Sequence, residues 1–307
     1  MYERNVRQAV GTLRPGAPMS DGPLCILPLR SDAKVGARYV LLEQAISRGT
    51  LTITEVSEAG SVPYLQAVNQ GPWPVLIFDG EELVGAKQNR IANATILVSV
   101  GKSVLPVSCV EQGRWSHRSA GFSAGAYASH PTLRRQKERQ VFERSRAATA
   151  RPRAEAASGP SSEEAQPLRA RRFMSDQGRV WDEVGRSSRS LGSASPTMAM
   201  ADAYETGRSD LEKTMQTFAL DASCVPDDTV GTMVFLGGQF VCMDVLRPAK
   251  RFLRLYPKLL RGYALEALLH KAPVTKDFDP EASAFRLFAE ILEAHVDEQA
   301  AADLGYD

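Results

Sequence analysis

Residues 80–93, the first polar motif, are dense in carboxylate, amide and basic side chains, although apolar, strand-like segments flank them. Buried polar groups cost free energy unless they are paired. The motif is therefore either a solvated loop or a site whose groups satisfy one another. A second polar motif follows at residues 107–115. If residues 107–111 are extended, Cys109 and Glu111 share one face of the strand, because successive side chains alternate.

Two carboxylates in these motifs can do acid–base chemistry. Glu82 and Glu111 are our catalytic candidates, as general acid and base or as carboxylate ligands of Mg²⁺. Glu81 does not pair with Glu82, because neighbours in an extended strand point in opposite directions. The alternative is a structural network in which these carboxylates form salt bridges with nearby basic residues.

Basic and amide side chains of the same motifs can hold a phosphorylated ligand. Arg90 and Arg114 can grip phosphate oxygens bidentately, and the amides can read a base or ribose edge. The same groups can instead pair with carboxylates or satisfy loop backbone. The candidate ligand-binding residues are Lys87, Gln88, Asn89, Arg90, Asn93, Gln112, Arg114, Trp115, Asp176 and Gln177.

Three residues have a functional and a structural interpretation. Cys109 is a nucleophile only if its pKa is lowered, and neither motif contains a histidine, so the alternative is a buried, inert thiol. Trp115 can stack on a base or pack in the core. Asp176 can contact a ligand or favour the start of a helix.

The spacing of potential metal ligands argues against a zinc site, because the four histidines show no paired spacing and no two cysteines are close. The sequence also contains no P-loop, no dinucleotide-binding glycine fingerprint after a strand and no nucleophile elbow, which disfavours three common enzyme classes. The cofactor stays unknown, with Mg²⁺ possible through the carboxylates.

The elements that carry the motifs are β-rich. Strand-like runs span residues 24–29, 51–56, 65–68 and 75–78, and residues 41–46 fit a short helix. Asp79-Gly80 is a hairpin-type turn signal, and residues 94–100 and 104–110 predict another hairpin. We expect a sandwich or a small barrel in this part of the chain.

Helices dominate the rest of the chain. Residues 131–148 predict a helix with few apolar anchors, and the composition of residues 148–170 predicts a mobile loop. Ser175 can cap a helix through Val184, and apolar residues from Tyr204 to Phe218 predict a second. A Gly237-Gly238 hairpin, a helix over 252–268 with Pro257 kinking or restarting it, and an amphipathic helix over 285–296 follow.

This order of elements favours an α+β fold: a β-rich N-terminal part, sandwich-like or barrel-like, then a helical middle, then the Gly-Gly hairpin with C-terminal helices packed on it. We expect three segments: 20–116, which carries the two polar motifs; 117–174, a basic helix and mobile loop; and 175–307, which forms one continuous domain with the first.

Composition limits the classes of protein that the chain can belong to. In 307 residues, 37 Lys+Arg against 36 Asp+Glu leave a net charge of +1, so no global charge attracts nucleic acid or an anionic membrane. Four scattered cysteines are typical of a reducing compartment. Without an 18-residue apolar run or a signal peptide, we expect no membrane association and a cytoplasmic protein.

Charge is nevertheless uneven along the chain. Residues 118–172 hold 12 Lys+Arg against 5 Asp+Glu, whereas residues 273–307 hold 2 against 9. The basic segment 118–172 can dock a protein partner, or it is a solvated helix and loop. Nucleic acid is disfavoured as its ligand, because no aromatic residues interleave the arginines.

Two strings, GEELVGAKQNRIANATILV at residues 80–98 and LPVSCVEQGRW at 105–115, resemble the ARPP-1 family. The name stands for "ARG and rhodanese-phosphatase-superfamily associated protein", in which ARG means ADP-ribosylglycohydrolase. The resemblance extends to residues 175–184, to Gly237-Gly238 and to residues 257–265, whereas residues 144–170 look like an addition to the family pattern.

The resemblance implies a link with ADP-ribose and phosphate-handling proteins rather than a mechanism. The residues it carries over are Glu81, Glu82, Lys87, Gln88, Asn89, Arg90, Asn93, Cys109, Glu111, Gln112, Arg114, Trp115, Asp176, Gln177 and Trp181.

Two hypotheses follow. The first is a nucleotide-handling protein that binds or processes ADP-ribose, NAD or a related phosphorylated nucleoside at the two motifs, as a sensor or as an enzyme such as a hydrolase or transferase. The second is a non-enzymatic interaction or scaffold module whose motifs form a structural polar network. They differ in whether the motif side chains line an open cleft or satisfy one another.

Overall fold

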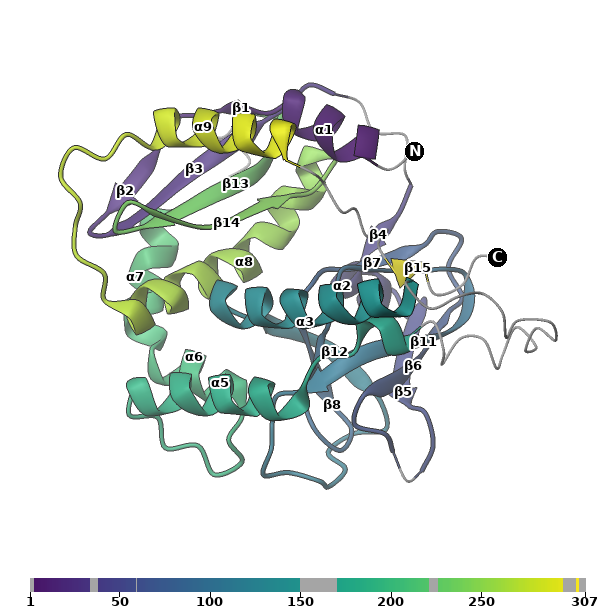
Figure 1. The fold of residues 1–307 in the computed structure, drawn as a ribbon. Coiled ribbons are helices and arrows are strands. Elements are labelled where there is room, and N and C mark those ends of the chain that lie inside the picture. Colours follow the sequence, from purple (N-terminus) through teal and green to yellow (C-terminus); the bar gives the residue numbers. More distant parts are fainter. Residues whose placement is uncertain are drawn as a thin grey trace. The chain divides into compact units, whose positions relative to one another are not determined.

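The computed structural model describes residues 3–33, 38–58, 60–149, 170–220, 226–294 and 302–303 (Figure 1). The fold is mixed α+β, with N-terminal β sheets that include a half-barrel, followed by helices, which confirms the predicted class. The chain forms two compact units: residues 1–37 with 207–300, and residues 38–206 with 301–307. We call them the first and the second unit.

The first unit contains a five-stranded antiparallel sheet in which β3 and β13 are central. Both strands are buried almost throughout, because α8 covers one face of the sheet and α1 and α9 cover the other (Figure 1). Its strands are β1 (Arg14–Pro15), β2 (Met19–Asp21), β3 (Leu24–Arg30), β13 (Thr229–Leu236) and β14 (Gln239–Val245). Its helices are α1 (Glu3–Gly11), α7 (Arg208–Thr217), α8 (Ala249–His270) and α9 (Pro280–Glu293).

The second unit contains a six-stranded sheet in the order β12-β8-β9-β11-β6-β5 and a four-stranded sheet in the order β15-β10-β7-β4. Helix α2 packs against β5, β7 and β12, and its Leu42 and Ala45 are completely buried. The strands are β4 (Val40–Leu41), β5 (Leu51–Glu55), β6 (Tyr64–Asn69), β7 (Val75–Ile77), β8 (Glu81–Gly85), β9 (Arg90–Ala92), β10 (Ile96–Val98), β11 (Gly101–Cys109), β12 (Phe122–Ala128) and β15 (Ala302–Asp303), and α2 spans Leu42–Ser47.

Both polar motifs lie in the six-stranded sheet. The first motif supplies β8, a turn and β9, and the second supplies the end of β11, which pairs with β9. In this register Arg90 lies opposite Cys109 and next to Leu83 on the other side. Paired residues of antiparallel strands point to the same face, so the sheet brings the two motifs together.

The helices of the second unit follow β12. They are α3 (Pro131–Thr149), the short 3₁₀ helix η2 (Arg171–Phe173), α5 (Gln177–Ser190) and α6 (Met200–Thr206). Helix α3 contacts η2 and α5, and α5 contacts β11 and α6. The end of β11, which carries the second motif, is therefore joined directly to α5.

Several local predictions are confirmed. The short helix at 41–46, the helix at 131–148, the Gly237-Gly238 hairpin and the helix over 252–268 all form, and α8 runs through Pro257 without restarting. The predicted loop 148–170 and the end of the helix over 285–296 lie largely outside the described residues.

Four local predictions are wrong. Asp79-Gly80 is a turn, but β7 and β8 do not pair, and β10 and β11 belong to different sheets rather than to one hairpin. Asp176, not Ser175, caps α5 by accepting a hydrogen bond from the Arg179 N–H. The helix predicted over 204–218 is two helices, α6 and α7, that break at Gly207. Turn signals locate a reversal but not the strand that the chain pairs with next.

The two units group residues differently from the three segments expected from composition, and those segment boundaries stay a prediction. Among the described residues, no helix combines the length and the apolar character that crossing a bilayer requires.

Replacing Gly85 with alanine tests the close approach of strands at the end of β8. Gly85 has φ 141°, and a Cβ there would lie 2.4 Å from the Gly121 carbonyl oxygen. We expect Gly85→Ala to lower the free energy of unfolding by about 3 kcal/mol or more. The control Gly192→Ala has a positive φ but open space around the Cβ, and should cost only about 1–2 kcal/mol. Equal losses in urea denaturation would contradict the steric argument.

Candidate functional site

The carboxylate of Glu111 is the meeting point of the two motifs. Only 1% of the residue is exposed. Its Oε2 atom accepts hydrogen bonds from the Arg114 guanidinium at 2.6 Å and from the Asn89 backbone N–H at 3.1 Å. The Gln88 amide donates to the Glu111 backbone carbonyl at 3.1 Å. One buried negative charge thus holds the first motif to the second.

The pKa of Glu111 reflects this pairing. Burial acts to raise the pKa, but the hydrogen bonds from Arg114 and from the Asn89 N–H outweigh burial, so the pKa lies below its ordinary value of 4.5. Glu111 is therefore ionised at neutral pH. A paired carboxylate of this kind is a strong structural anchor and a poor general acid.

Asn89 extends the network to Glu82. The Asn89 amide donates to Glu82 Oε1 at 3.3 Å, and its own oxygen accepts from Arg114 at 3.2 Å. Glu82 is 1% exposed. A Cβ on Gly125 of β12 would lie 2.6 Å from Glu82 Oε2, so β12 passes directly against this carboxylate. Both catalytic candidates are therefore enclosed and paired.

Arg90 is less well satisfied. The residue is 0% exposed, and its Nη1 donates to Gln88 Oε1 at 2.8 Å. Its Nε and Nη2 atoms are buried and meet no hydrogen-bond partner among the described residues, and the same holds for Oε2 of Glu55. Burial lowers the pKa of Arg90, against the effects of Cys109 and Glu55, which raise it.

Cys109 lies opposite Arg90 and is a buried free thiol. Burial raises its pKa, and this effect exceeds the lowering by the Glu111 N–H, Arg90 and Trp181. The thiol is therefore neutral at physiological pH, which matches the inert alternative rather than a nucleophile.

Gln177 joins the same strand end to α5. Its amide oxygen accepts from the Cys109 N–H and its amide nitrogen donates to the Cys109 carbonyl, both at 2.8 Å. Asp176 next to it is the N-cap of α5. Asn93 accepts from the Ser108 hydroxyl at 2.6 Å. These three candidates hold elements in place in this structure.

Five candidates reach the surface. Trp115 is 48% exposed, Gln112 and Asp176 are exposed, and Lys87 and Gln177 are partly exposed. The Lys87 ammonium lies 5.3 Å and the Arg90 guanidinium carbon 5.8 Å from the Trp115 ring centroid. We call this region the Trp115 face. The catalytic and ligand-binding roles of all twelve candidates stay predictions.

The sequence analysis did not single out a second group of polar residues on α3. Lys137 is completely buried and donates to Asp79 at 2.7 Å, and Arg134 donates to the same carboxylate at 3.2 Å. His130 contacts Glu183 of α5 at 3.3 Å. The two ion pairs with Asp79 fix α3 to the sheet, and the contact of His130, just before α3, links the start of this helix to α5.

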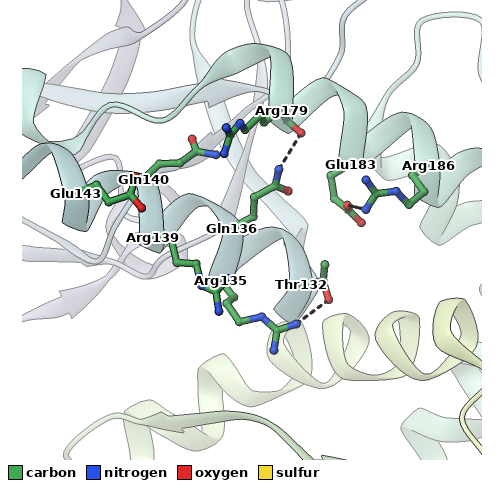
Figure 2. Close-up of a pocket in the computed structure, with 9 residues that line it drawn as sticks. All are labelled: Thr132, Arg135, Gln136, Arg139, Gln140, Glu143, Arg179, Glu183 and Arg186. Atoms are coloured by element: carbon green, nitrogen blue, oxygen red, sulfur yellow. Dashed lines mark hydrogen bonds and ion pairs between the residues drawn. The ribbon is translucent and has the colours of Figure 1, made fainter.

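A pocket of about 410 Å³ lies between α3 and α5 (Figure 2). It is lined by Thr132, Arg135, Gln136, Arg139, Gln140, Glu143, Arg179, Glu183 and Arg186. The signal for it was present in the sequence, because its six α3 residues recur at intervals of three and four and so share one helix face. The high charge of this helix had favoured a solvated face instead.

Among the described residues, no group of three or more His, Cys, Asp or Glu side chains is arranged to hold a metal ion.

Removing the charge of Glu111 tests the network. Because its folded pKa is depressed, Glu111 contributes stability above its unfolded pKa of about 4.5 and loses it as the pH falls through the lower folded value. We expect Glu111→Gln to lower the free energy of unfolding by about 3–5 kcal/mol at pH 7, since Arg114 loses its counter-ion. The variant should also lose part of the decline in stability below about pH 4.5.

The measurement is urea denaturation between pH 3.5 and 7, with the exposed Asp182→Asn as control. The control should change stability by less than about 1 kcal/mol at pH 7. An unchanged pH profile in Glu111→Gln would show that this carboxylate does not anchor the motifs.

The comparisons with known proteins give a family but no characterised relative. No curated protein and no solved structure matches the chain. The model of the ARPP-1 family, described as "ARG and Rhodanese-Phosphatase-superfamily-associated Protein domain", matches residues 12–307, which include both motifs, the α3–α5 region and the whole first-unit sheet. The chain therefore belongs to the ARPP-1 family.

Proposed function

We propose that the protein is a nucleotide-handling protein that binds ADP-ribose, NAD or a related phosphorylated nucleoside at the Trp115 face. The observation that carries the proposal is Arg90, whose guanidinium is buried behind an exposed tryptophan and has two nitrogen atoms, Nε and Nη2, without a partner among the described residues. The family description, with its reference to ADP-ribosylglycohydrolase and phosphatase superfamilies, supports the same ligand class.

Unpartnered polar atoms define the chemistry of the ligand. A buried donor without an acceptor costs about 1–3 kcal/mol, and more when it is charged. Arg90 offers two donors and Glu55 one acceptor. A ligand that brings phosphate or carbonyl oxygens to Arg90 and a ribose hydroxyl to Glu55 satisfies both.

Trp115 supplies the second element of the proposed site. An exposed indole offers a face on which a nucleobase can stack, worth about 1–3 kcal/mol per base. Lys87 beside the ring adds a positive charge for a phosphate. A base on Trp115 and phosphate oxygens near Lys87 and Arg90 describe a nucleotide rather than a sugar or an amino acid.

Glu82, Glu111, Asn89 and Arg114 have a supporting role in this proposal, because they already satisfy one another. A hydrolase or transferase reaction would require one of the two carboxylates to leave its partner. We therefore propose binding and assign no reaction.

The second candidate function is a scaffold module. The closed hydrogen-bond network around Glu111 favours it, since a polar network that satisfies itself needs no ligand. In this alternative, the basic segment 118–172 docks a protein partner.

Thermal unfolding against NAD, ADP-ribose, AMP, cyclic nucleotides and Mg²⁺ separates the two functions. A ligand present at about 100 times its Kd stabilises the protein by about 2.7 kcal/mol. We expect at least one nucleotide to raise the melting temperature, and Arg90→Met and Trp115→Ala to lose that increase. The control Arg48→Gln removes an exposed positive charge elsewhere on the second unit and should keep it.

A flat panel would favour the scaffold, especially if Glu82→Gln lowered the melting temperature without changing any response to ligand. Equal ligand shifts in the wild type, Arg90→Met and Trp115→Ala would place the nucleotide away from the Trp115 face.

A further inference from the structure

The pocket between α3 and α5 differs from the Trp115 face in its composition. Its nine lining residues are all polar, and none belongs to either motif (Figure 2). Its volume of about 410 Å³ lies in the range of small-molecule sites, about 300–1,000 Å³. Most such sites are largely apolar, so a pocket with only polar side chains indicates a charged or heavily hydrogen-bonded ligand.

The charges of the pocket favour an anion. Four arginines against two glutamates leave a formal excess of two positive charges. Arg186 pairs with Glu183, and Arg179 lies 4.0 Å from Asp176. Arg135 bonds only the Thr132 hydroxyl, and Arg139 has no ion-pair partner within the described part of the chain. Two guanidinium groups on α3 therefore meet no counter-ion among the described residues.

The spacing of these two arginines suits a phosphate group. Residues four apart on a helix lie on one face, about 6 Å apart along the axis. Planar guanidinium groups match the oxygens of phosphate bidentately. A phosphate monoester carries a charge of about −1.5 to −2 at pH 7, which balances the formal excess of the pocket.

Gln140 provides an independent sign of a ligand. It is 7% exposed and extends from α3 toward Arg179 on α5 (Figure 2). Its Oε1 accepts from the Asp176 N–H, which fixes the orientation of the amide. Its Nε2 is buried and meets no acceptor among the described residues. A lining donor held in place without an acceptor is suited to an oxygen of a bound molecule.

The walls of the pocket are held by contacts outside it. Lys137 fixes α3 to Asp79, and Gln177 fixes the start of α5 to Cys109. Glu183, which itself lines the pocket, contacts His130, the residue just before α3. A site whose walls are already fixed loses less ordering entropy when a ligand binds.

We propose that the α3–α5 pocket is a second binding site, which takes the phosphate group of a small phosphorylated molecule. Arg135 and Arg139 bind the phosphate oxygens, and the Gln140 amide donates one further hydrogen bond. The site does not depend on the Trp115 face, so either can exist without the other.

Calorimetric titration of the full chain with inorganic pyrophosphate, and with ribose 5-phosphate against ribose, tests the proposal. We expect both phosphates to bind and ribose not to bind, with affinity falling as salt rises. Arg139→Gln should weaken binding about 10- to 100-fold, the factor for one lost charge-assisted hydrogen bond. Gln140→Glu keeps an acceptor for the Asp176 N–H but replaces the donor with a negative charge, and should abolish binding.

Two controls keep the result specific. Arg146→Gln removes the same charge from α3 outside the pocket and should leave the affinity within about twofold. Arg48→Gln removes an exposed charge elsewhere on the second unit and should also leave pyrophosphate binding unchanged. The loss caused by Arg139→Gln should be the same in an Arg90→Met background, so a failure of the proposed nucleotide function is distinguishable from a failure here. Circular dichroism of each variant confirms that the helices are intact.

Three results would overturn the proposal. The first is no heat of binding at millimolar pyrophosphate in low salt. The second is binding that Arg139→Gln and Gln140→Glu leave unchanged. The third is a short single-stranded oligonucleotide that binds far more tightly than either phosphate and depends on Arg139, which would assign the pocket to nucleic acid.

Discussion

Glu111 places a negative charge in the interior of the second unit, and groups from both polar motifs balance that charge. An unpaired buried carboxylate would be very costly, so the carboxylate is compatible with the fold only when Asn89 and Arg114 are both in position. The register of β9 on β11, the turn before β9 and the loop after β11 are thereby fixed together. The end of β11, which α5 contacts, is therefore held in one position.

Single side chains hold the neighbouring helices against these strands. Gln177 binds both backbone groups of Cys109, two residues before Glu111, and so sets where α5 begins. Lys137 of α3 donates to Asp79 and to the Ala92 carbonyl of β9, and so holds α3 against the sheet. The facing sides of the two helices carry polar residues, which line the pocket between them. The polar density of a motif and the location of an open pocket are thus separate properties in this chain.

Local sequence pattern predicted many of the helices and strands, but it did not predict which strands of the second unit pair with one another. The buried runs of β3 and β13 and the Gly237-Gly238 hairpin follow from apolar periodicity and turn chemistry. The hairpin prediction at Asp79-Gly80 was wrong because a turn fixes only a change of direction. The strand β8 pairs with β9 and with the distant β12, not with β7. Likewise, the polar density of the motifs predicted that they contact each other. It did not predict that Glu82 is shielded from solvent, because the residue that lies against it, Gly125, is far along the chain.

The contact between Gly125 and Glu82 also limits which residues β12 can carry opposite β8. A methyl group at position 125 would occupy the space of the Glu82 side chain, so position 125 cannot gain a side chain while Glu82 is present. Lineages in which β12 gains a side chain at this point must shorten residue 82 at the same time, and Asn89 then loses an acceptor. A strand with mostly small side chains therefore limits how the polar strand β8 can diverge.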